Sequence, residues 1–148
     1  GSLVYKLQGI VQSLGNLDYV PPALSPMDIR SVECKEWLSL LEEVESYSTY
    51  EMIILDFDES VDGFLEILRR CQMVYMPVRE DNISVAKIRQ YEKLLEFAGY
   101  GDLEEKTRKL KLPFHGNFGQ GTQYVEQLIW GELGDFARNL IREEFGNG

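Results

Sequence analysis

The sequence predicts an α/β fold in which a mostly parallel sheet is flanked by helices, as a three-layer sandwich. Apolar runs without alternation, at Met52–Leu55 and Met73–Met76, are typical of strands that are buried on both faces. Segments with apolar residues at three- and four-residue spacing lie between these runs, so strand and helix alternate along the chain. The length of 148 residues suits one domain over residues 3–148. We interpret Gly1-Ser2 as a cloning remnant.

The first expected elements precede residue 50. Leu17–Val20 is a short strand candidate that stops at a Pro-Pro pair, because proline cannot continue a strand ladder. A helix is expected to begin at Ser25-Pro26, since proline suits the first helical position. Cys34–Val44 has apolar residues on one side and glutamates on the other, which predicts an amphipathic helix.

The remaining elements follow the same alternation. After the strand at Met52–Leu55, Val61–Arg70 is predicted to be a helix. The strand Met73–Met76 ends at Pro77 and precedes a long helix over Ile83–Phe97. The last predicted elements are a weaker strand at Leu110–Leu112, a glycine-rich loop at His115–Thr122, and one or two helices over Tyr124–Phe145, which Gly131 and Gly134 can interrupt.

Charge argues against two classes of partner. The chain has 15 Lys and Arg residues against 25 Asp and Glu residues, a net charge of -10, and such a surface repels phosphate backbones and anionic lipid headgroups. We interpret the basic group at Lys106–Lys111 as a solvated face, because Glu104 and Glu105 precede it. The helical region Tyr124–Phe145 has an apolar stripe on one side and mainly acidic residues on the other. A helix that lies on a membrane surface has mainly basic residues on its polar side. We therefore expect this stripe in the core or in a protein interface, and no nucleic-acid or membrane partner.

Cysteine and histidine usage favours a cytoplasmic protein without a cysteine- or histidine-based metal or redox site. Cys34 and Cys71 lack metal or redox spacing, so reduced thiols in or near the core are expected. His115, the single histidine, has no acid or nucleophile beside it in the sequence. No secretory signal opens the chain, and no apolar run approaches the roughly 20 residues that span a bilayer.

Residues 50–95 carry a resemblance to a known family. An apolar strand ends in Asp56, a helix follows, a second strand ends in Pro77-Val78, and a helix begins near Ser84. This order resembles the middle of bacterial ParA/MinD-like P-loop ATPases, and the C-terminal tail resembles that of their pilus-assembly and localisation members. The resemblance implies the C-terminal half of a P-loop NTPase-like fold.

The resemblance also implies a role for Asp56. In that family, the aspartate that ends this strand holds a water of the Mg²⁺ that bridges the nucleotide phosphates. Asp56 would then be a Walker B-like residue that binds Mg²⁺ through water, with Asp58 and Glu59 beside it. The chain has no glycine-rich phosphate-binding loop with its lysine. We therefore expect Mg-ATP binding in an intact parent protein, but no catalytic residue and no tight cofactor binding in this chain alone.

Two functions stay open at this point. The chain is either the C-terminal portion of an ATPase that positions or assembles a cell structure, or a non-catalytic protein-interaction domain that kept the fold. A receiver-like signalling domain with Asp56 as phosphoacceptor fits less well, because the 21 residues from Asp56 to Pro77 are fewer than receivers need. Without the strand of the phosphate-binding loop, Met52–Leu55 must find another strand or leave an open edge, so a protein partner or a homo-oligomer is expected.

Overall fold

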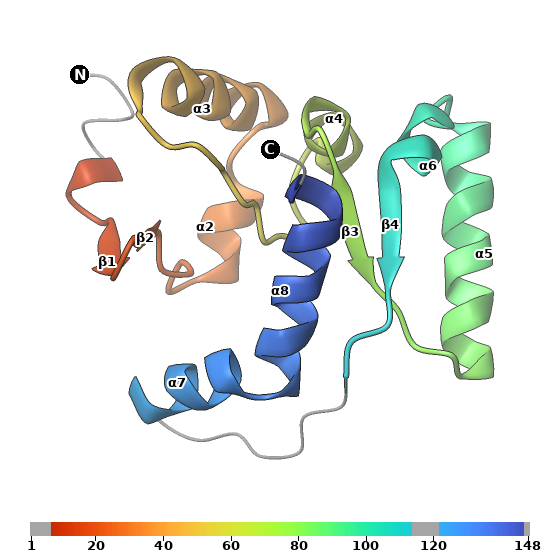
Figure 1. The fold of residues 1–148 in the computed structure, drawn as a ribbon. Coiled ribbons are helices and arrows are strands. Elements are labelled where there is room, and N and C mark those ends of the chain that lie inside the picture. The colour runs from red at the N-terminus through yellow and green to blue at the C-terminus, as the bar shows by residue number, and fades with distance from the viewer. Residues whose placement is uncertain (1–6, 114–121, 147–148) are drawn as a thin grey trace. The chain divides into compact units, whose positions relative to one another are not determined.

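The computed structural model describes residues 7–113 and 122–146. The fold is α/β, with helices, one antiparallel strand pair and one parallel strand pair (Figure 1). The chain divides into two compact units, residues 1–72 and residues 73–148, here called the N-terminal and C-terminal units. The sequence-based prediction of one domain over residues 3–148 stays a prediction.

The N-terminal unit begins with a hairpin of β1 (Gln12–Leu14) and β2 (Leu17–Tyr19), which pair in antiparallel register with Leu14 opposite Leu17. The strand expected at Leu17–Val20 is therefore confirmed, with an unforeseen partner. Gly15 has a φ of 60° at the first position of the two-residue turn. A glycine tolerates this left-handed conformation, and such short turns match the twist of the two strands.

Three helices follow the hairpin in the described part of this unit. Ser25 caps α2 (Pro26–Arg30), whose first residue is the expected proline. The predicted amphipathic helix is α3 (Cys34–Tyr47), and the predicted helix at Val61–Arg70 begins later, as α4 (Phe64–Arg70). The later start has a local cause, because the preceding residues form a turn that ends at Gly63 with a φ of 70°. Among the described residues of this unit, Val61, Ile67 and Leu68 are the buried apolar ones.

The prediction of a strand at Met52–Leu55 is wrong. The segment belongs to no helix or strand, and Figure 1 draws it as an irregular trace between α3 and α4. A strand requires a neighbour that satisfies its backbone N–H and C=O groups. Within the described residues this segment has no such neighbour, so an apolar run alone did not produce a strand.

The C-terminal unit contains a parallel pair of strands with helices between them. β3 (Val74–Pro77) lies beside β4 (Thr107–Leu110), with Val74 opposite Thr107 and Pro77 opposite Leu110. The connection runs through α5 (Asn82–Phe97) and the short α6 (Asp102–Lys106), and Figure 1 shows α5 alongside β4. β3 and α5 confirm the sequence prediction, whereas β4 lies earlier than the strand expected at Leu110–Leu112.

The core of the C-terminal unit is small. Leu95 of α5 and Leu103 of α6 are its buried apolar residues among those described. The apolar residues Ile83 and Leu94 of α5 are both exposed. Leu94 precedes the buried Leu95 and lies one helical step around α5 from it, so the buried face of α5 is narrower than its apolar pattern suggests.

Two helices form a corner at the end of the C-terminal unit. α7 (Thr122–Trp130) and α8 (Glu132–Phe145) meet at Gly131, so the predicted Tyr124–Phe145 helical region is two helices. A Cβ atom at Gly134 would lie 2.0 Å from the Ile129 carbonyl oxygen, so the first turn of α8 passes very close to the end of α7. Arg138 of α8 donates a hydrogen bond to the Ile129 carbonyl oxygen at 2.7 Å, which joins α8 to the end of α7, and another to Asp135 of α8 at 2.6 Å.

The described part of the chain forms two small two-stranded sheets. The three-layer sandwich with a larger parallel sheet stays a prediction. None of the helices in the described ranges combines the length and the apolar character that crossing a bilayer requires. The loop expected at His115–Thr122 lies outside the described residues, apart from Thr122 at the start of α7.

Candidate interaction surface

The most distinctive feature in the described part of the N-terminal unit is an apolar segment whose backbone pairs with no other described residue. Within the described residues, no backbone hydrogen bond involves Met52–Leu55. Exposure alternates along it: the side chains of Met52 and Ile54 are 54% and 77% exposed, whereas Ile53 is 38% exposed and Leu55 is half-buried. This period of two is the pattern of a strand with one face partly covered and one face open. Met52–Leu55 is here called the open segment.

A hydrogen bond to the hairpin anchors the chain just before the open segment. The Tyr50 hydroxyl donates to Asp18 of β2 at 2.7 Å, and the Ser13 hydroxyl of β1 donates to the other oxygen of the same carboxylate. The hydrogen bonds from Ser13 and Tyr50 lower the pKa of Asp18, and the bond to Asp18 raises the pKa of Tyr50. The carboxylate therefore holds the hairpin and Tyr50 together when it is ionised.

Two contacts anchor the chain just after the open segment. The ring of Phe57 lies edge-to-face against Phe64 of α4, with centroids 5.4 Å apart. Asp58 accepts a hydrogen bond from the Ser60 backbone N–H at 2.9 Å, and the hydrogen bonds from the side chain and backbone of Ser60 lower the pKa of Asp58. This local turn is typical of aspartate in loops. The open segment thus lies between two fixed points.

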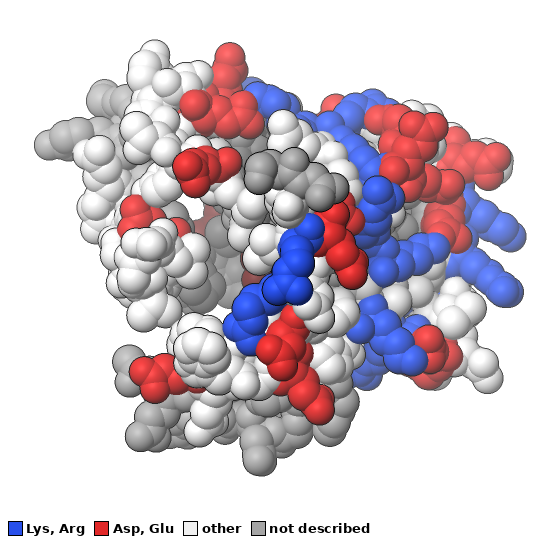
Figure 2. Space-filling model, in the orientation of Figure 1, with Lys and Arg blue, Asp and Glu red and all other residues white. Residues whose placement is uncertain are grey.

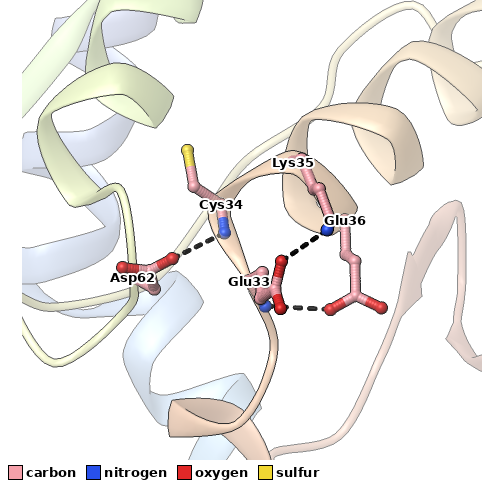
Figure 3. Close-up of polar contacts among 5 residues, drawn as sticks. All are labelled: Glu33, Cys34, Lys35, Glu36 and Asp62. Atoms are coloured by element: carbon pink, nitrogen blue, oxygen red, sulfur yellow. Dashed lines mark hydrogen bonds and ion pairs between the residues drawn. The ribbon is translucent and has the colours of Figure 1, made fainter.

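The turn before α4 is joined to the first residue of α3 (Figure 3). Asp62 accepts a hydrogen bond from the Cys34 backbone N–H at 2.8 Å, and the Glu33 backbone N–H donates to Glu36 at 2.9 Å. Both carboxylates thereby satisfy donors at the start of α3, where negative charge is favourable. Burial is the largest cause that raises the pKa of the Cys34 thiol, and the negative charges of Asp62 and Glu66 raise it further. The thiol is therefore kept protonated, which makes it a poor nucleophile.

Gly63 allows the turn before α4 to approach the first residue of α3, Cys34, very closely. A Cβ atom at Gly63 would lie 2.0 Å from Sγ and 2.4 Å from Cβ of Cys34. Both distances are far below van der Waals contact, and the φ of 70° also favours glycine. An ion pair between Arg70 and Glu45 joins α4 to α3 at a further point. These contacts make the α3–α4 pair a defined support for the loop that carries the open segment.

The net charge of the chain is confined to one stretch of the N-terminal unit. Between Lys35 and Arg69 there is no Lys or Arg, and ten residues are acidic. The rest of the chain has 15 acidic and 15 basic residues, so residues 36–68 account for the whole net charge of -10. Within the described residues, Glu51 and Asp56, which flank the open segment directly, make no ion pair. The ten acidic residues are Glu36, Glu42, Glu43, Glu45, Glu51, Asp56, Asp58, Glu59, Asp62 and Glu66.

The basic side chains of β4 and of Lys111, which follows it, are paired with carboxylates inside the C-terminal unit. Arg108 contacts Glu144 of α8 at 3.4 Å. Lys109 pairs with Glu92 of α5, and a 2.6 Å ion pair joins Lys111 to Glu80. Figure 2 shows Lys and Arg side chains interleaved with Asp and Glu over the region of β4 and α5. The basic group seen in the sequence is therefore locally balanced, in contrast to residues 36–68.

Asp56 is exposed and directly follows the open segment. Mg²⁺ is usually bound through one or two carboxylates together with substrate phosphates and water. Within the described residues, no three His, Cys, Asp or Glu side chains are grouped to hold a metal ion, and Asp58 is engaged with Ser60. The described residues do not fit a complete Mg²⁺ site around Asp56. Its Walker B-like role stays a prediction.

The apolar run and Asp56 were predictable from the sequence, but the contacts around them were not. Tyr50 and Asp18 are 32 positions apart, and no local spacing rule connects them. The Asp62–Cys34 contact likewise spans 28 positions. The charge separation was readable from the sequence, because a count of Lys and Arg between residues 36 and 68 gives zero. Comparisons with protein-family models, with curated proteins and with solved structures found no match for this chain.

Proposed function

We propose that this chain is a non-catalytic protein-interaction domain. The observation that carries the proposal is the imbalance between buried and exposed apolar side chains. Among the described residues, the buried apolar core consists of Val61, Ile67, Leu68, Leu95 and Leu103, whereas many large apolar side chains are exposed in both units. Exposed apolar surface that gathers on a protein typically marks an interaction site.

Burying a large apolar side chain contributes roughly 1.5–3 kcal/mol, so covering even a few of these residues favours association. Exposure of single apolar residues is ordinary on protein surfaces. Here the exposed residues include consecutive ones in the open segment and several on α7 and α8. The exposed residues of these two groups are Met52, Ile53, Ile54, Ile129, Trp130, Ile141 and Phe145.

Site-specific photo-crosslinking in the native cell extract tests the proposal. A photo-reactive residue at Ile54, Ile129 or Phe145 is expected to form discrete protein adducts, because these exposed apolar positions would be covered by partners. The same probe at Gln90, an exposed polar position on α5, is the matched control and is expected to form none. Equal labelling at all four positions, or elution of the chain from the native extract at its monomer mass of 17.1 kDa, would contradict the proposal.

A second candidate function follows from the resemblance to ParA/MinD-like ATPases. The feature that favours it is β3, which ends at Pro77 and lies parallel to β4 after an intervening helix, as the resemblance implies. In this case the chain is the C-terminal portion of an ATPase, the open segment is completed into a larger sheet in the three-layer sandwich, and the intact protein binds Mg-ATP.

Asp56→Asn in the intact parent protein tests this second candidate. The substitution keeps the size of the side chain and removes the charge, so nucleotide turnover should fall strongly if Asp56 positions the Mg²⁺ water. Asp28→Asn, at another exposed carboxylate, is the control. Unchanged turnover in the Asp56 variant would remove the Walker B-like assignment.

A further inference from the structure

The geometry points to the open segment, Met52–Leu55, as a strand-addition site. We propose that it takes an extended apolar strand from a partner protein, and that Lys or Arg residues flank this partner strand. The inference rests on the proposed interaction function and specifies where one partner binds and what its binding segment looks like. Three features of the N-terminal unit carry it: backbone availability, anchoring at both ends, and charge.

Among the described residues, none pairs with the backbone of the open segment. Within the described residues its N–H and C=O groups make no backbone hydrogen bond. Its residues are two isoleucines, which favour strands, with a methionine and a leucine, and their exposure alternates as in a strand. An added strand gains main-chain hydrogen bonds along the segment and covers the more exposed side chains of Met52 and Ile54. Shape and chemistry thus fit a strand better than a helix, which cannot satisfy these backbone groups.

Anchoring lowers the entropic cost of pairing. Tyr50 is held by Asp18 before the segment, and Phe57 is held by Phe64 after it. A free loop must be ordered before it accepts a strand, and this ordering opposes binding. Because both ends are held, the open segment has less conformational freedom to lose when a strand binds.

Charge decides between a second copy of this chain and a different partner. If two open segments paired antiparallel with Ile53 opposite Ile54, Glu51 of each copy would lie opposite Asp56 of the other. Like charges directly opposite in a strand pair are destabilising. Both copies would also carry the -10 charge of residues 36–68 in the same place. A partner strand flanked by Lys or Arg is instead attracted to Glu51, to Asp56 and to the acidic stretch as a whole. We therefore assign the site to a different protein with a strand of this kind.

Two synthetic peptides probe the site. Both contain the same alternating Val-Thr core of six residues; one carries two lysines at each end and the other two glutamates. Fluorescence anisotropy should show the lysine peptide binding at least about ten-fold more tightly than the glutamate peptide, and added salt should weaken only the lysine peptide. Amide hydrogen exchange should slow at residues 52–56 when the lysine peptide is added.

Two variants separate backbone pairing from charge. Ile54→Pro removes a backbone donor at an exposed position, so it should abolish binding of the lysine peptide, whereas the control Ile54→Val should bind normally. The double substitution Glu51→Lys and Asp56→Lys should reverse the preference towards the glutamate peptide. Far-UV circular dichroism checks that each variant keeps its helices.

Several results would overturn the inference. Equal affinity for the two peptides would remove the charge argument, and unaltered binding by Ile54→Pro would remove strand pairing. Protected amides at residues 52–56 in the chain without peptide would mean that the edge is already occupied. A dimer that protects the same amides would assign the site to a second copy. If these tests fail while Ile129 and Phe145 still crosslink to partners, the strand site is wrong and the interaction function stands.

Discussion

Replacing Gly63 with alanine tests the junction that supports the open segment. The substitution has two costs in this structure. The φ of 70° places alanine in the left-handed region, which costs about 1 kcal/mol. The new Cβ would lie 2.0 Å from Sγ and 2.4 Å from Cβ of Cys34, so rotating the cysteine side chain cannot relieve the clash and the backbone must move. Overpacking of this kind costs about 2 kcal/mol, which gives a total loss of about 3 kcal/mol.

Gly15→Ala is the matched control. Gly15 also has a positive φ, of 60°, but a Cβ there would meet nothing within 4 Å. Alanine at this position therefore carries the backbone strain without the clash, and the expected loss is about 1 kcal/mol. The change in unfolded-state entropy is the same for both substitutions and cancels in the comparison.

Urea unfolding followed by tryptophan fluorescence measures both losses. Of the two tryptophans, Trp37 lies in α3 next to the junction, and the exposed Trp130 can be replaced with phenylalanine so that Trp37 alone reports. With a denaturant slope of about 1.5 kcal/mol/M, Gly63→Ala should lower the midpoint by about 2 M and Gly15→Ala by about 0.7 M. Equal shifts would refute the close approach between α3 and the turn before α4.

Three further predictions concern single contacts. Asp62→Ala leaves the first N–H of α3 without its acceptor and should cost about 1 kcal/mol in the same urea assay, with Asp62→Asn costing less. Gly134→Ala places a methyl group on a backbone carbonyl at the α7–α8 corner and should lower the helical signal in circular dichroism, whereas Gly99→Ala should not. Tyr50→Phe should lower the urea midpoint at neutral pH. Because Asp18 has a lowered pKa, its contribution is lost as pH falls through that value, below 3.8. Because Tyr50 has a raised pKa, its contribution is lost as pH rises through that value, above 10. The difference between Tyr50→Phe and the unaltered protein should therefore narrow at both extremes, and a constant difference would contradict the assigned bond.

Local signals predicted several elements well. Ser25 with Pro26 marks the start of α2, because a side-chain acceptor and a proline both suit a helix N-terminus. The apolar periodicity from Trp37 onward predicts α3, and Pro77 marks the end of β3. In each case the information lies within a few residues, so no knowledge of distant segments is needed.

Pairing was not predictable in the same way. A buried central strand and an unpaired apolar segment have the same local sequence, so Met52–Leu55 alone could not reveal that its neighbour is missing from the described residues. β4 begins at Thr107 rather than Leu110. Arg108, Lys109 and Lys111 form ion pairs with carboxylates that are distant in the sequence. The anchor between Tyr50 and Asp18 was likewise invisible, since two polar side chains far apart in the chain carry no spacing signal.

The absence of cations from residues 36–68 has a consequence for handling the protein. The open segment has the apolar composition of an aggregation-prone strand. At neutral pH, the negative charges of Glu51 and Asp56 at its two ends oppose stacking of one copy on another. Near pH 4.6, the isoelectric point of the sequence, the net charge of the chain falls to zero, so the net electrostatic repulsion between copies is weakest. Mild acid should then let copies stack through Met52–Leu55 into β-rich aggregates, which turbidity and thioflavin fluorescence would detect, and Ile54→Pro should delay them.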